Sequence, residues 1–304
     1  MSDFRVHILG CGSALPTTRH YPSAQVLAYR EKLFLIDCGE GAQRQWRALR
    51  LDFGRLVAVF ISHLHGDHCY GLPGLLSTLS LLGRRRALPI YGPRGIADYL
   101  APFISSSTSW LGYEIEVHTL DDRQAGPVYE DRSLTVSSLP LDHRMPCTGY
   151  LFRERGLERH IDRASCDFYG VPVSAFKALR EGADYTTPEG QLIPNARLTR
   201  PAKAGRSYAY CSDTAYRPAL IPLLQGVDLL YHEATFPRER AARAAETGHS
   251  TAEQAAQIAR ASGVGRLLIG HYSARYSDAT PLLEEARALF PETTAADELM
   301  TLEV

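Results

Sequence analysis

The chain contains 304 residues, of which 45% are hydrophobic, so it is long enough for one large domain or two ordinary domains with a buried core. Its 33 Lys and Arg residues nearly balance its 34 Asp and Glu residues, and the formal net charge of -1 argues against a protein that coats nucleic acid through overall charge. The six scattered cysteines form no C-x-x-C pair, which argues against a structural zinc site or a disulfide framework and favours a reduced, cytoplasmic location.

The N-terminal sequence, MSDFRVHILGCGSALP, has an acidic third residue and too short an apolar run for a signal peptide. About 18 consecutive apolar residues, the length of a membrane-spanning helix, occur nowhere in the sequence. We therefore expect neither export nor a membrane span.

Short apolar runs separated by turn signals predict a series of strands in the first half of the chain. These runs cover residues 5–10, 24–29, 33–39, 56–62, 88–93, 113–120 and 133–141. Helical patterns separate some of them, at residues 42–50, 72–83 and 95–104. The alternation predicts an α/β fold with mixed sheets.

The fourth predicted strand is followed by a cluster of metal-binding side chains, the motif HLHGDH, which contains His63, His65, Asp67 and His68. Imidazoles and a carboxylate at the end of a buried strand are costly unless something binds them. Gly66 permits a sharp backbone path, so His63 and His65 can reach one ion while Asp67 and His68 point toward a second. The motif predicts a divalent metal centre.

The regular pattern stops at about residue 155 and resumes at about residue 200. This stretch contains turn signals and one short helical candidate, residues 173–182, and it resembles an insertion or arm. Residues 153–206 carry ten Lys and Arg against seven Asp and Glu, a net charge of +3. The charge fits either a solvated loop or a local basic surface for nucleic acid.

Strand patterns then return, at residues 206–213, 226–234 and 265–273. Helices are predicted at residues 251–263 and 282–291.

Three further candidate ligands, His143, Asp213 and His271, each follow an apolar strand and precede a turn. Taken singly, each is more often a core or loop residue than a ligand. Together with the HLHGDH cluster they complete two metal sites if Asp213 bridges, because the two oxygens of a carboxylate can hold ions about 3.5–4 Å apart.

The HLHGDH motif resembles the signature of the metallo-β-lactamase superfamily, and three later motifs narrow the resemblance. HEATF at residues 232–236, GHSTAEQAA from Gly248 and GHYSARY from Gly270 resemble the ribonuclease Z family, the endonucleases that mature the 3′ end of transfer RNA. The resemblance covers nearly the whole chain. It implies a four-layer αββα sandwich of two mixed β-sheets with outer helices, formed by one domain over residues 1–304 with a protruding, substrate-binding arm inserted at residues 155–200.

The resemblance also implies two zinc ions (Zn2+) per chain. One ion would be held by His63, His65 and His143, the other by Asp67, His68 and His271, with Asp213 between them. Asp67 is further implied to take part in catalysis.

Phosphodiester hydrolysis requires a proton on the leaving 3′ oxygen, and His249 is the candidate donor. The spacing of Ser250 and Glu253 is typical of a capping box, so a helix start would hold the imidazole in place. The family pattern suggests that Glu233 orients His249 and raises its pKa. Arg275 lies just past a ligand strand and could hold a phosphate through two hydrogen bonds. The alternative for His249 is an ordinary residue before a helix cap, and the alternative for Arg275 is an exposed loop arginine.

The sequence thus predicts a cytoplasmic, zinc-dependent endoribonuclease with no membrane contact. It would remove the 3′ trailer of precursor transfer RNA after the discriminator base by two-metal hydrolysis, leaving a 3′ hydroxyl. The family further implies a homodimer, in which the arm of one subunit grips substrate cut by the other. Two alternatives remain: a small-molecule phosphodiesterase or arylsulfatase of the same superfamily, and a non-catalytic RNA-binding module with structural metals. The complete ligand set together with His249 disfavours the second.

Overall fold

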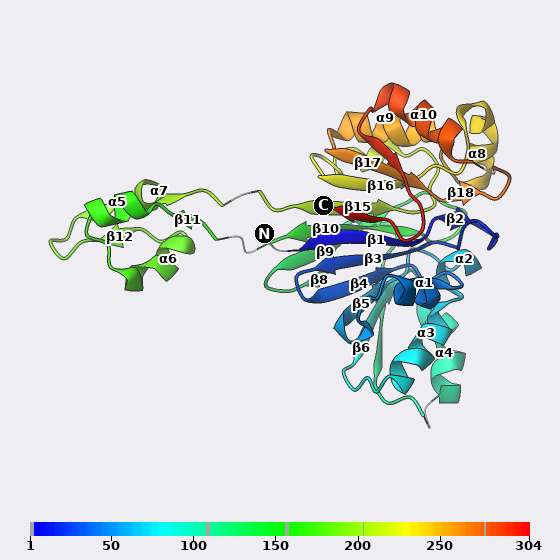
Figure 1. Ribbon diagram of the computed structural model, residues 1–304, viewed down its shortest axis with the longest axis horizontal. Helices are drawn as coiled ribbons and strands as arrows, with labels where there is room; N and C mark the ends of the chain where they lie inside the picture. The colour runs from blue at the N-terminus through cyan, green and yellow to red at the C-terminus, as the bar shows by residue number, and fades with distance from the viewer. Residues whose placement is uncertain (1–2, 108–109, 156–157, 203, 277) are drawn as a thin grey trace. The chain divides into compact units, whose positions relative to one another are not determined.

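The computed structural model describes residues 3–107, 110–155, 158–202, 204–276 and 278–304 (Figure 1). The chain divides into two compact units. The larger unit comprises Met1–Tyr129, Val136–Phe152 and Ser207–Val304, and the smaller comprises Glu130–Thr135 and Arg153–Arg206.

The first sheet has seven strands in the order β20-β1-β3-β4-β5-β6-β7. These strands are β1 (Phe4–Gly10), β3 (Ala24–Tyr29), β4 (Lys32–Ile36), β5 (Leu56–Phe60), β6 (Leu88–Gly92), β7 (Ile115–Thr119) and β20 (Thr301–Glu303). β20, β1, β3 and β4 pair antiparallel, whereas β4 to β7 pair parallel. The sheet is therefore mixed, as the sequence predicts.

The second sheet also has seven strands, in the order β19-β17-β16-β15-β10-β9-β8. Its strands are β8 (Gly126–Glu130), β9 (Leu134–Pro140), β10 (Thr148–Glu154), β15 (Ser207–Cys211), β16 (Leu229–Glu233), β17 (Arg266–Gly270) and β19 (Thr293–Ala295). β15, β16, β17 and β19 pair parallel. Parallel strands run in the same direction, so their C-terminal ends lie at the same edge of the sheet. The loops that follow β15, β16 and β17 therefore emerge at one edge.

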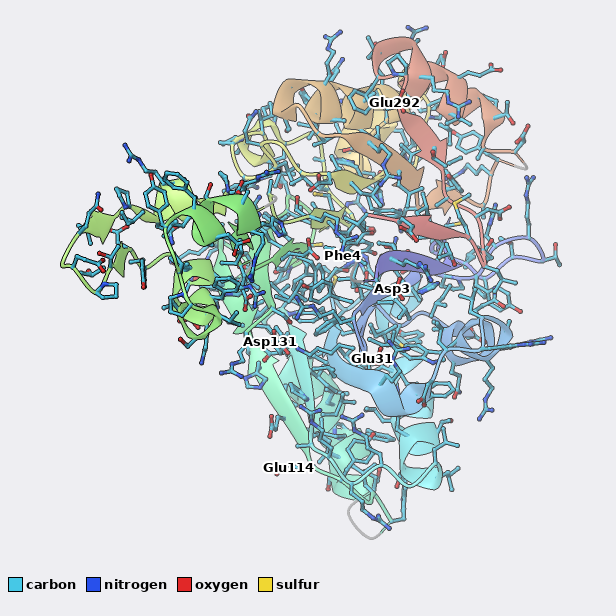
Figure 2. The ribbon with its side chains drawn as sticks, turned by 60° about the vertical axis from the view of Figure 1, so that its left-hand side comes forward. Asp3, Phe4, Glu31, Glu114, Asp131 and Glu292 are labelled. Carbon is cyan, nitrogen blue, oxygen red and sulfur yellow. The ribbon has the colours of Figure 1, made fainter. Side chains whose placement is uncertain are left out.

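Aromatic side chains fill the space between the two sheets. The ring of Phe152 on β10 lies 6.1 Å from that of Phe34 on β4 and 5.4 Å from that of Phe60 on β5, between ring centroids. At the edge of the same core, the buried Phe4 packs against Tyr29, whereas charged side chains such as Glu31 lie exposed (Figure 2). Burial of large apolar rings between two sheets is the main stabilising contribution to such a sandwich.

Helices cover the outer face of each sheet (Figure 1). On the first sheet, buried side chains of three helices join one apolar cluster with those of β4 and β5; the helices are α1 (Ala42–Ala48), α3 (Leu72–Leu81) and α4 (Ile96–Ser107). Over the second sheet lie α9 (Ala252–Ser262) and α10 (Thr280–Leu289). The structure thus has the predicted four-layer αββα arrangement.

Shorter elements complete the larger unit. They are α2 (Gly66–Cys69), α8 (Ala241–Thr247), the 3-10 turns η1 (Phe53–Arg55), η3 (Pro218–Leu220) and η4 (Arg238–Arg240), and the parallel pair β2 (Gly12–Ser13) and β18 (Tyr272–Ser273).

The smaller unit has its own apolar cluster, formed by Cys166, Val171, Leu179, Ile193 and Leu198. Around it lie α5 (Arg163–Phe168), η2 (Val173–Ala175), α6 (Phe176–Arg180) and α7 (Asn195–Leu198), with the short strand pairs β11 (His160–Ile161) with β14 (Thr199–Arg200) and β12 (Tyr185–Thr186) with β13 (Leu192–Ile193). The arm expected at residues 155–200 falls in this unit, although its residues 156 and 157 lie outside the described part of the chain.

The two ends of the Arg153–Arg206 segment of the smaller unit pair with each other. The Glu154 backbone N–H donates to the Arg206 carbonyl at 2.9 Å, and the Arg206 guanidinium pairs with the Glu154 carboxylate at 2.9 Å. The two ends of the Arg153–Arg206 segment of this unit therefore lie at neighbouring positions.

All six cysteines are free and buried, in agreement with the absence of a predicted disulfide framework. Across the described ranges, none of the helices combines the length and apolar composition needed to cross a bilayer.

Candidate metal centre

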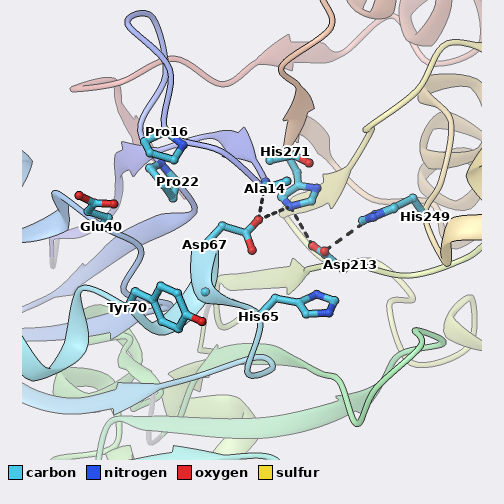
Figure 3. Close-up of a pocket in the computed structure, with 12 residues that line it drawn as sticks. Ala14, Pro16, Pro22, Glu40, His65, Asp67, Tyr70, Asp213, His249 and His271 are labelled. Carbon is cyan, nitrogen blue, oxygen red and sulfur yellow. Dashed lines mark hydrogen bonds and ion pairs between the residues drawn. The ribbon is translucent and has the colours of Figure 1, made fainter.

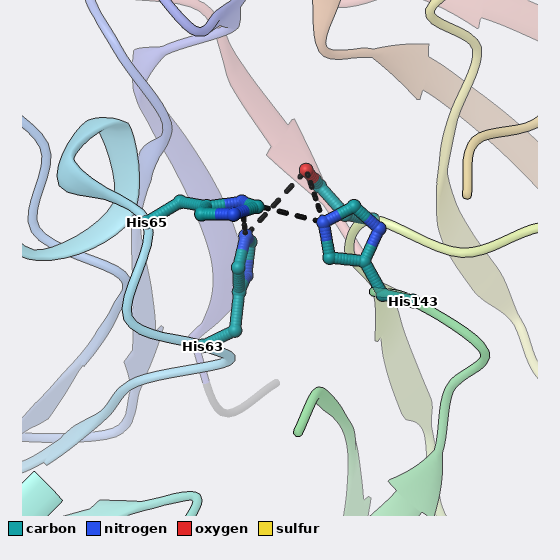
Figure 4. Close-up of side chains that lie close together, drawn as sticks. His63, His65 and His143 are labelled. Atoms are coloured by element: carbon teal, nitrogen blue, oxygen red, sulfur yellow. Dashed lines mark hydrogen bonds and ion pairs between the residues drawn. The ribbon is translucent and has the colours of Figure 1, made fainter. Parts of the chain in front are cut away.

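The first predicted ligand set converges in the structure (Figure 4). Nδ1 of His65 lies 3.0 Å from Nε2 of His63 and 3.3 Å from Nε2 of His143. His63 is fully buried. The three ring nitrogens thus face one point, although His143 is 78 residues from His65 in the sequence.

The second predicted set converges beside the first. Nε2 of His68 lies 3.3 Å from Nε2 of His271, and Oδ2 of Asp67 lies 3.5 Å from each of these nitrogens. His68 and His271 are buried, and Asp67 lies on the wall of a cavity (Figure 3).

Asp213 lies between the two sets and presents one oxygen to each. Its Oδ2 is 3.5 Å from Nε2 of His63 and 3.9 Å from Nε2 of His143. Its Oδ1 is 3.4 Å from Nε2 of His68 and 3.2 Å from Nε2 of His271. These distances fit the bridging role that the sequence left conditional.

The ligand positions follow from strand ends at one edge of the sandwich. β5 leads into His63 and His65, β9 precedes His143, β15 precedes Asp213, and β17 precedes His271. His271 has a φ of 63°, a left-handed conformation that is strained for a non-glycine residue. Backbone hydrogen bonds on both sides hold it there, from Ala234 N–H to the Gly270 carbonyl and from Tyr272 N–H to the Cys11 carbonyl.

Outer partners orient the ligand rings. Nδ1–H of His143 donates to the Gly248 carbonyl at 2.8 Å, so its Nε2 keeps a lone pair for the cluster. Nδ1 of His271 lies 2.9 Å from Oγ1 of Thr235, and Nδ1 of His68 lies 2.7 Å from the Asp37 carboxylate.

Sequence analysis missed Asp37. This buried carboxylate also accepts hydrogen bonds from Ser62 N–H at 2.7 Å and from the Tyr210 hydroxyl at 2.7 Å, and so it ties together three segments behind the ligands. The signal was present, because Asp37 directly follows the apolar strand β4, as the ligands follow theirs. Its partners, however, are distant in sequence.

The pKa shifts differ between the ligands, because burial lowers the pKa of a histidine whereas at His68 the nearby carboxylates, Asp213 foremost, outweigh burial and raise the pKa well above its ordinary value. Burial lowers the pKa of His63 well below its ordinary value and also lowers that of His143, which favours the neutral imidazole that binds metals. Burial alone would raise the pKa of Asp213, but the nearby His271 and His68 outweigh it and hold the carboxyl ionised.

The residues present fit a pair of divalent cations. Two ligand atoms bound to zinc at about 2.1 Å in tetrahedral geometry lie about 3.4 Å apart, close to the 3.0–3.5 Å separations within each set. Lone pairs of converging nitrogens repel unless a cation or a proton lies between them. Nitrogen and carboxylate ligands of this kind suit zinc.

His249 lies next to the cluster and contacts Glu233. Its Nδ1 is 2.8 Å from Oε1 of Glu233 and 3.8 Å from Oδ2 of Asp213. Burial lowers the pKa of His249, but the Glu233 carboxylate outweighs burial and raises it to about 9. Glu233 is fully buried, and Thr214 N–H and Thr235 N–H donate to its two oxygens, so it is fixed independently of His249.

The predicted capping box is displaced by one residue. The N-cap of α9 is Thr251, whose hydroxyl accepts from Gln254 N–H, while the Gln254 side chain accepts from Thr251 N–H. The expected pair, Ser250 and Glu253, does not cap the helix, since Ser250 Oγ donates to the Thr214 carbonyl at 2.7 Å. Both pairs have capping-box spacing, and this tertiary hydrogen bond takes Ser250 away from the helix end.

Arg275 lies outside the ligand cluster. It is exposed and lines a cavity of about 360 Å³ that is also lined by His249, with Nη1 of Arg275 3.4 Å from Oγ of Ser273. The structure therefore brings seven predicted ligands, His249 and Glu233 together, and it sets Arg275 beside them.

Two protein-family models match parts of the chain. Residues 4–102 match the family described as anti-Pycsar protein Apyc1, and residues 158–272 match the one described as β-lactamase superfamily domain.

Full-length relatives are more informative. Proteins named Ribonuclease Z from Porphyromonas gingivalis (strain W83) and Parabacteroides distasonis are 55% and 57% identical over 304 residues, which is 100% of this chain and of each relative. The crystal structure of the short form of human tRNase Z matches with a TM-score of 0.71 and 27% identity, covering 98% of both chains.

Proposed function

Because the chain belongs to the ribonuclease Z family of the metallo-β-lactamase superfamily, we propose that its ligand cluster holds two zinc ions for hydrolysis of precursor transfer RNA. As a ribonuclease Z, the protein is an endonuclease that processes the 3′ end of transfer RNA. The proposal adds the metal count, the position of the cut and the roles of individual residues.

One observation carries the proposal: Asp213 offers one oxygen to each of two complete ligand sets. His63, His65 and His143 would hold one zinc ion, and Asp67, His68 and His271 the other. Two bound cations would acidify a water molecule and offset the negative charge that develops on the phosphate oxygens.

The chain's own residues would complete the reaction. Hydrolysis forms a bond from the water oxygen to phosphorus, while the water gives up a proton to the solvent, and it breaks the bond from phosphorus to the 3′ oxygen, which takes up a proton. His249 is suited to donate that proton, because Glu233 orients its ring and keeps it protonated at neutral pH. Arg275 would hold a substrate phosphate at the adjacent cavity.

The cut would fall after the discriminator base and leave a 3′ hydroxyl on the transfer RNA and a 5′ phosphate on the trailer. The smaller unit would be the substrate-binding arm inserted into a single sandwich domain. Its support is the net charge of +3 over residues 153–206 in a chain of net charge -1. We retain the homodimer that the family resemblance implies, and a cytoplasmic location, which the six free thiols favour.

The test is to incubate the metal-loaded protein with precursor transfer RNA labelled at either end and to map both product ends. We expect one cut after the discriminator base, with a 3′ hydroxyl and a 5′ phosphate. A protein that hydrolyses small phosphodiesters or aryl sulfates efficiently but leaves precursor transfer RNA intact would instead be the small-molecule hydrolase of the same superfamily.

A further inference from the structure

Two cavities meet beside the ligand cluster, and only the first of them is lined by candidate ligands. The first, of about 480 Å³, is lined by Asp67, Asp213 and His271 and extends to Tyr70 and Glu40 (Figure 3). The second, of about 360 Å³, extends to Arg243 and Arg275. Both are lined by Ser13, Ala14 and His249, so His249 stands at the boundary between them.

The Tyr70 side chain is unusual for its place in the fold. It is 68% exposed, although it directly follows the short helix α2, which carries ligands. Its ring lies against the backbone of Gly66, where any Cβ atom would collide with it, and its N–H donates to the Gly66 carbonyl at 2.9 Å. Exposing an aromatic ring is unfavourable in water, whereas a ring held against the backbone offers a preformed face to a ligand.

The two cavities differ in charge. The exposed Glu40 carboxylate lines the Tyr70 cavity, so that end repels phosphate and favours an uncharged ring with hydrogen-bond donors, such as a nucleobase. In the second cavity, Arg275 supplies a guanidinium group, which favours phosphate, and Arg243 adds a second one, whose Nη1 also pairs with Glu246 at 2.7 Å.

The position of His249 sets the direction of the substrate. This inference rests on the proposed function, in which His249 gives its proton to the leaving 3′ oxygen. The discriminator nucleotide carries that oxygen and therefore lies on the His249 side. The first trailer nucleotide is attached to phosphorus through its 5′ oxygen, which lies away from the line of attack and departure. Figure 3 shows Tyr70 and Glu40 on the opposite side of the cluster from His249.

We propose that Tyr70 is a stacking platform for the base of the first trailer nucleotide, whereas the discriminator nucleotide lies on the side of Arg243 and Arg275. Stacking on an aromatic ring tolerates any base, because every base has a π-face. The platform therefore suits an enzyme whose substrates differ in trailer sequence.

The test compares kcat/KM for precursors that are identical except for an abasic first trailer nucleotide. In the parent, loss of that base should lower kcat/KM by about 5- to 150-fold, the range typical of stacked bases. Tyr70→Ala should lower kcat/KM for the intact precursor by a similar factor, and the abasic change should then cost little more. Tyr70→Phe keeps the ring and should keep the abasic penalty.

Leu81→Ala is the matched control, because Leu81 is an exposed apolar residue on α3 that lines neither cavity, and it should respond to the abasic change as the parent does. A parent that cleaves the abasic precursor as fast as the intact one would overturn the proposal without any variant. If Tyr70→Ala instead removed the penalty for an abasic discriminator nucleotide, Tyr70 would stack on that base, and the proposed direction of the substrate across the site would be wrong. Failure of the parent to cleave any precursor would instead refute the proposed function.

Discussion

Each oxygen of Asp213 faces a different ligand set, and in the proposed centre both metal sites depend on this residue. Asp213→Ala should therefore reduce the bound metal at both sites, whereas His143→Ala should weaken only one. Elemental analysis should find about two zinc ions per parent chain, about one in His143→Ala and well below one in Asp213→Ala.

His160→Ala is a suitable control for metal content, because His160 is an exposed histidine in the smaller unit. It should bind as much zinc as the parent. If Asp213→Ala retains two ions, the bridging role is wrong.

His249 tests proton transfer separately from metal binding. His249→Ala should keep its zinc and bind precursor, while the single-turnover rate of cleavage falls by about 10²–10⁴, as is typical when a general acid is lost. Added imidazole should restore part of that rate. Loss of zinc in this variant would show that His249 is a ligand. Its Nδ1 lies only 3.8 Å from Oδ2 of Asp213, so this outcome is tested by the same metal analysis.

Glu233 tests the pH dependence. A general acid acts in its protonated form, so cleavage should decline as the pH rises through the pKa of His249, which Glu233 raises to about 9. Glu233→Gln removes the charge that raises this pKa, and burial then lowers it. The alkaline limb of the kcat/KM profile should move to lower pH in Glu233→Gln, and an unmoved limb would show that another group controls it.

At the scale of elements, the loop between β2 and β3 lies over the metal centre and depends on a distant carboxylate. Ala14 N–H donates to Oδ2 of Asp67 at 2.6 Å, which ties the loop to a predicted ligand. At the base of the loop, Glu298 accepts from Tyr21 N–H at 2.9 Å and pairs with Nδ1 of His20 at 2.8 Å. Glu298 thus joins the C-terminal segment to the loop.

Glu298→Gln should lower the free energy of unfolding by about 1–3 kcal/mol at neutral pH, because it weakens hydrogen bonds to a largely buried charge. Burial raises the pKa of Glu298, but His20 outweighs burial and lowers the pKa from 4.5. A carboxyl with a depressed folded-state pKa contributes stability above its unfolded pKa and loses it as the pH falls through the folded value. The difference between parent and variant should therefore shrink below about pH 4.5.

Chemical denaturation at several pH values measures this difference. Glu303→Gln is the control, because Glu303 lies in the same C-terminal segment and its ion pair with Arg5 is exposed. Glu303→Gln should lower the free energy of unfolding by less than Glu298→Gln does, because an exposed ion pair contributes little to stability. Equal effects of the two variants would contradict the role assigned to Glu298.

At the scale of the whole molecule, most of the smaller unit can be removed where the two ends of its Arg153–Arg206 segment pair with each other. Glu154 N–H and the Arg206 carbonyl are 2.9 Å apart, so a short glycine-rich turn can replace residues 155–205 without moving either strand. The shortened protein should fold, bind zinc and hydrolyse a small activated phosphodiester, but it should bind precursor transfer RNA weakly. Its affinity should fall less steeply with salt than that of the parent, because it makes fewer phosphate contacts.

Unchanged precursor cleavage and salt dependence after this deletion would show that the smaller unit does not bind RNA. Mixing the shortened protein with full-length His249→Ala tests the dimer. Each partner supplies what the other lacks, so mixed dimers should regain cleavage if the arm of one subunit serves the site of the other. The absence of any gain on mixing would contradict that arrangement.

The sequence by itself determined the local features of this protein. Apolar runs predicted the strands from residue 24 to residue 29 and around residue 58 correctly, and the spacing within HLHGDH pointed to four candidate ligands that the structure brings to one site. These signals are local, because strand pleating and loop geometry act over a few neighbouring residues. Strands β8, β19 and β20 were not predicted, since they are short or partly exposed and owe their pairing to distant partners.

Only the tertiary structure decided which groups meet. Asp37 supports His68 from 31 residues away, and the Thr214 carbonyl takes the Ser250 hydroxyl from the helix end that the sequence assigned to it. The Tyr70 and Arg243 cavities likewise arise where separate loops converge at the edge of the sandwich. The sequence pattern indicates which segments can be buried and which side chains can bind a ligand. The choice among partners depends on the packing of the two sheets, which brings His68 and His271, 203 positions apart, within 3.3 Å of each other.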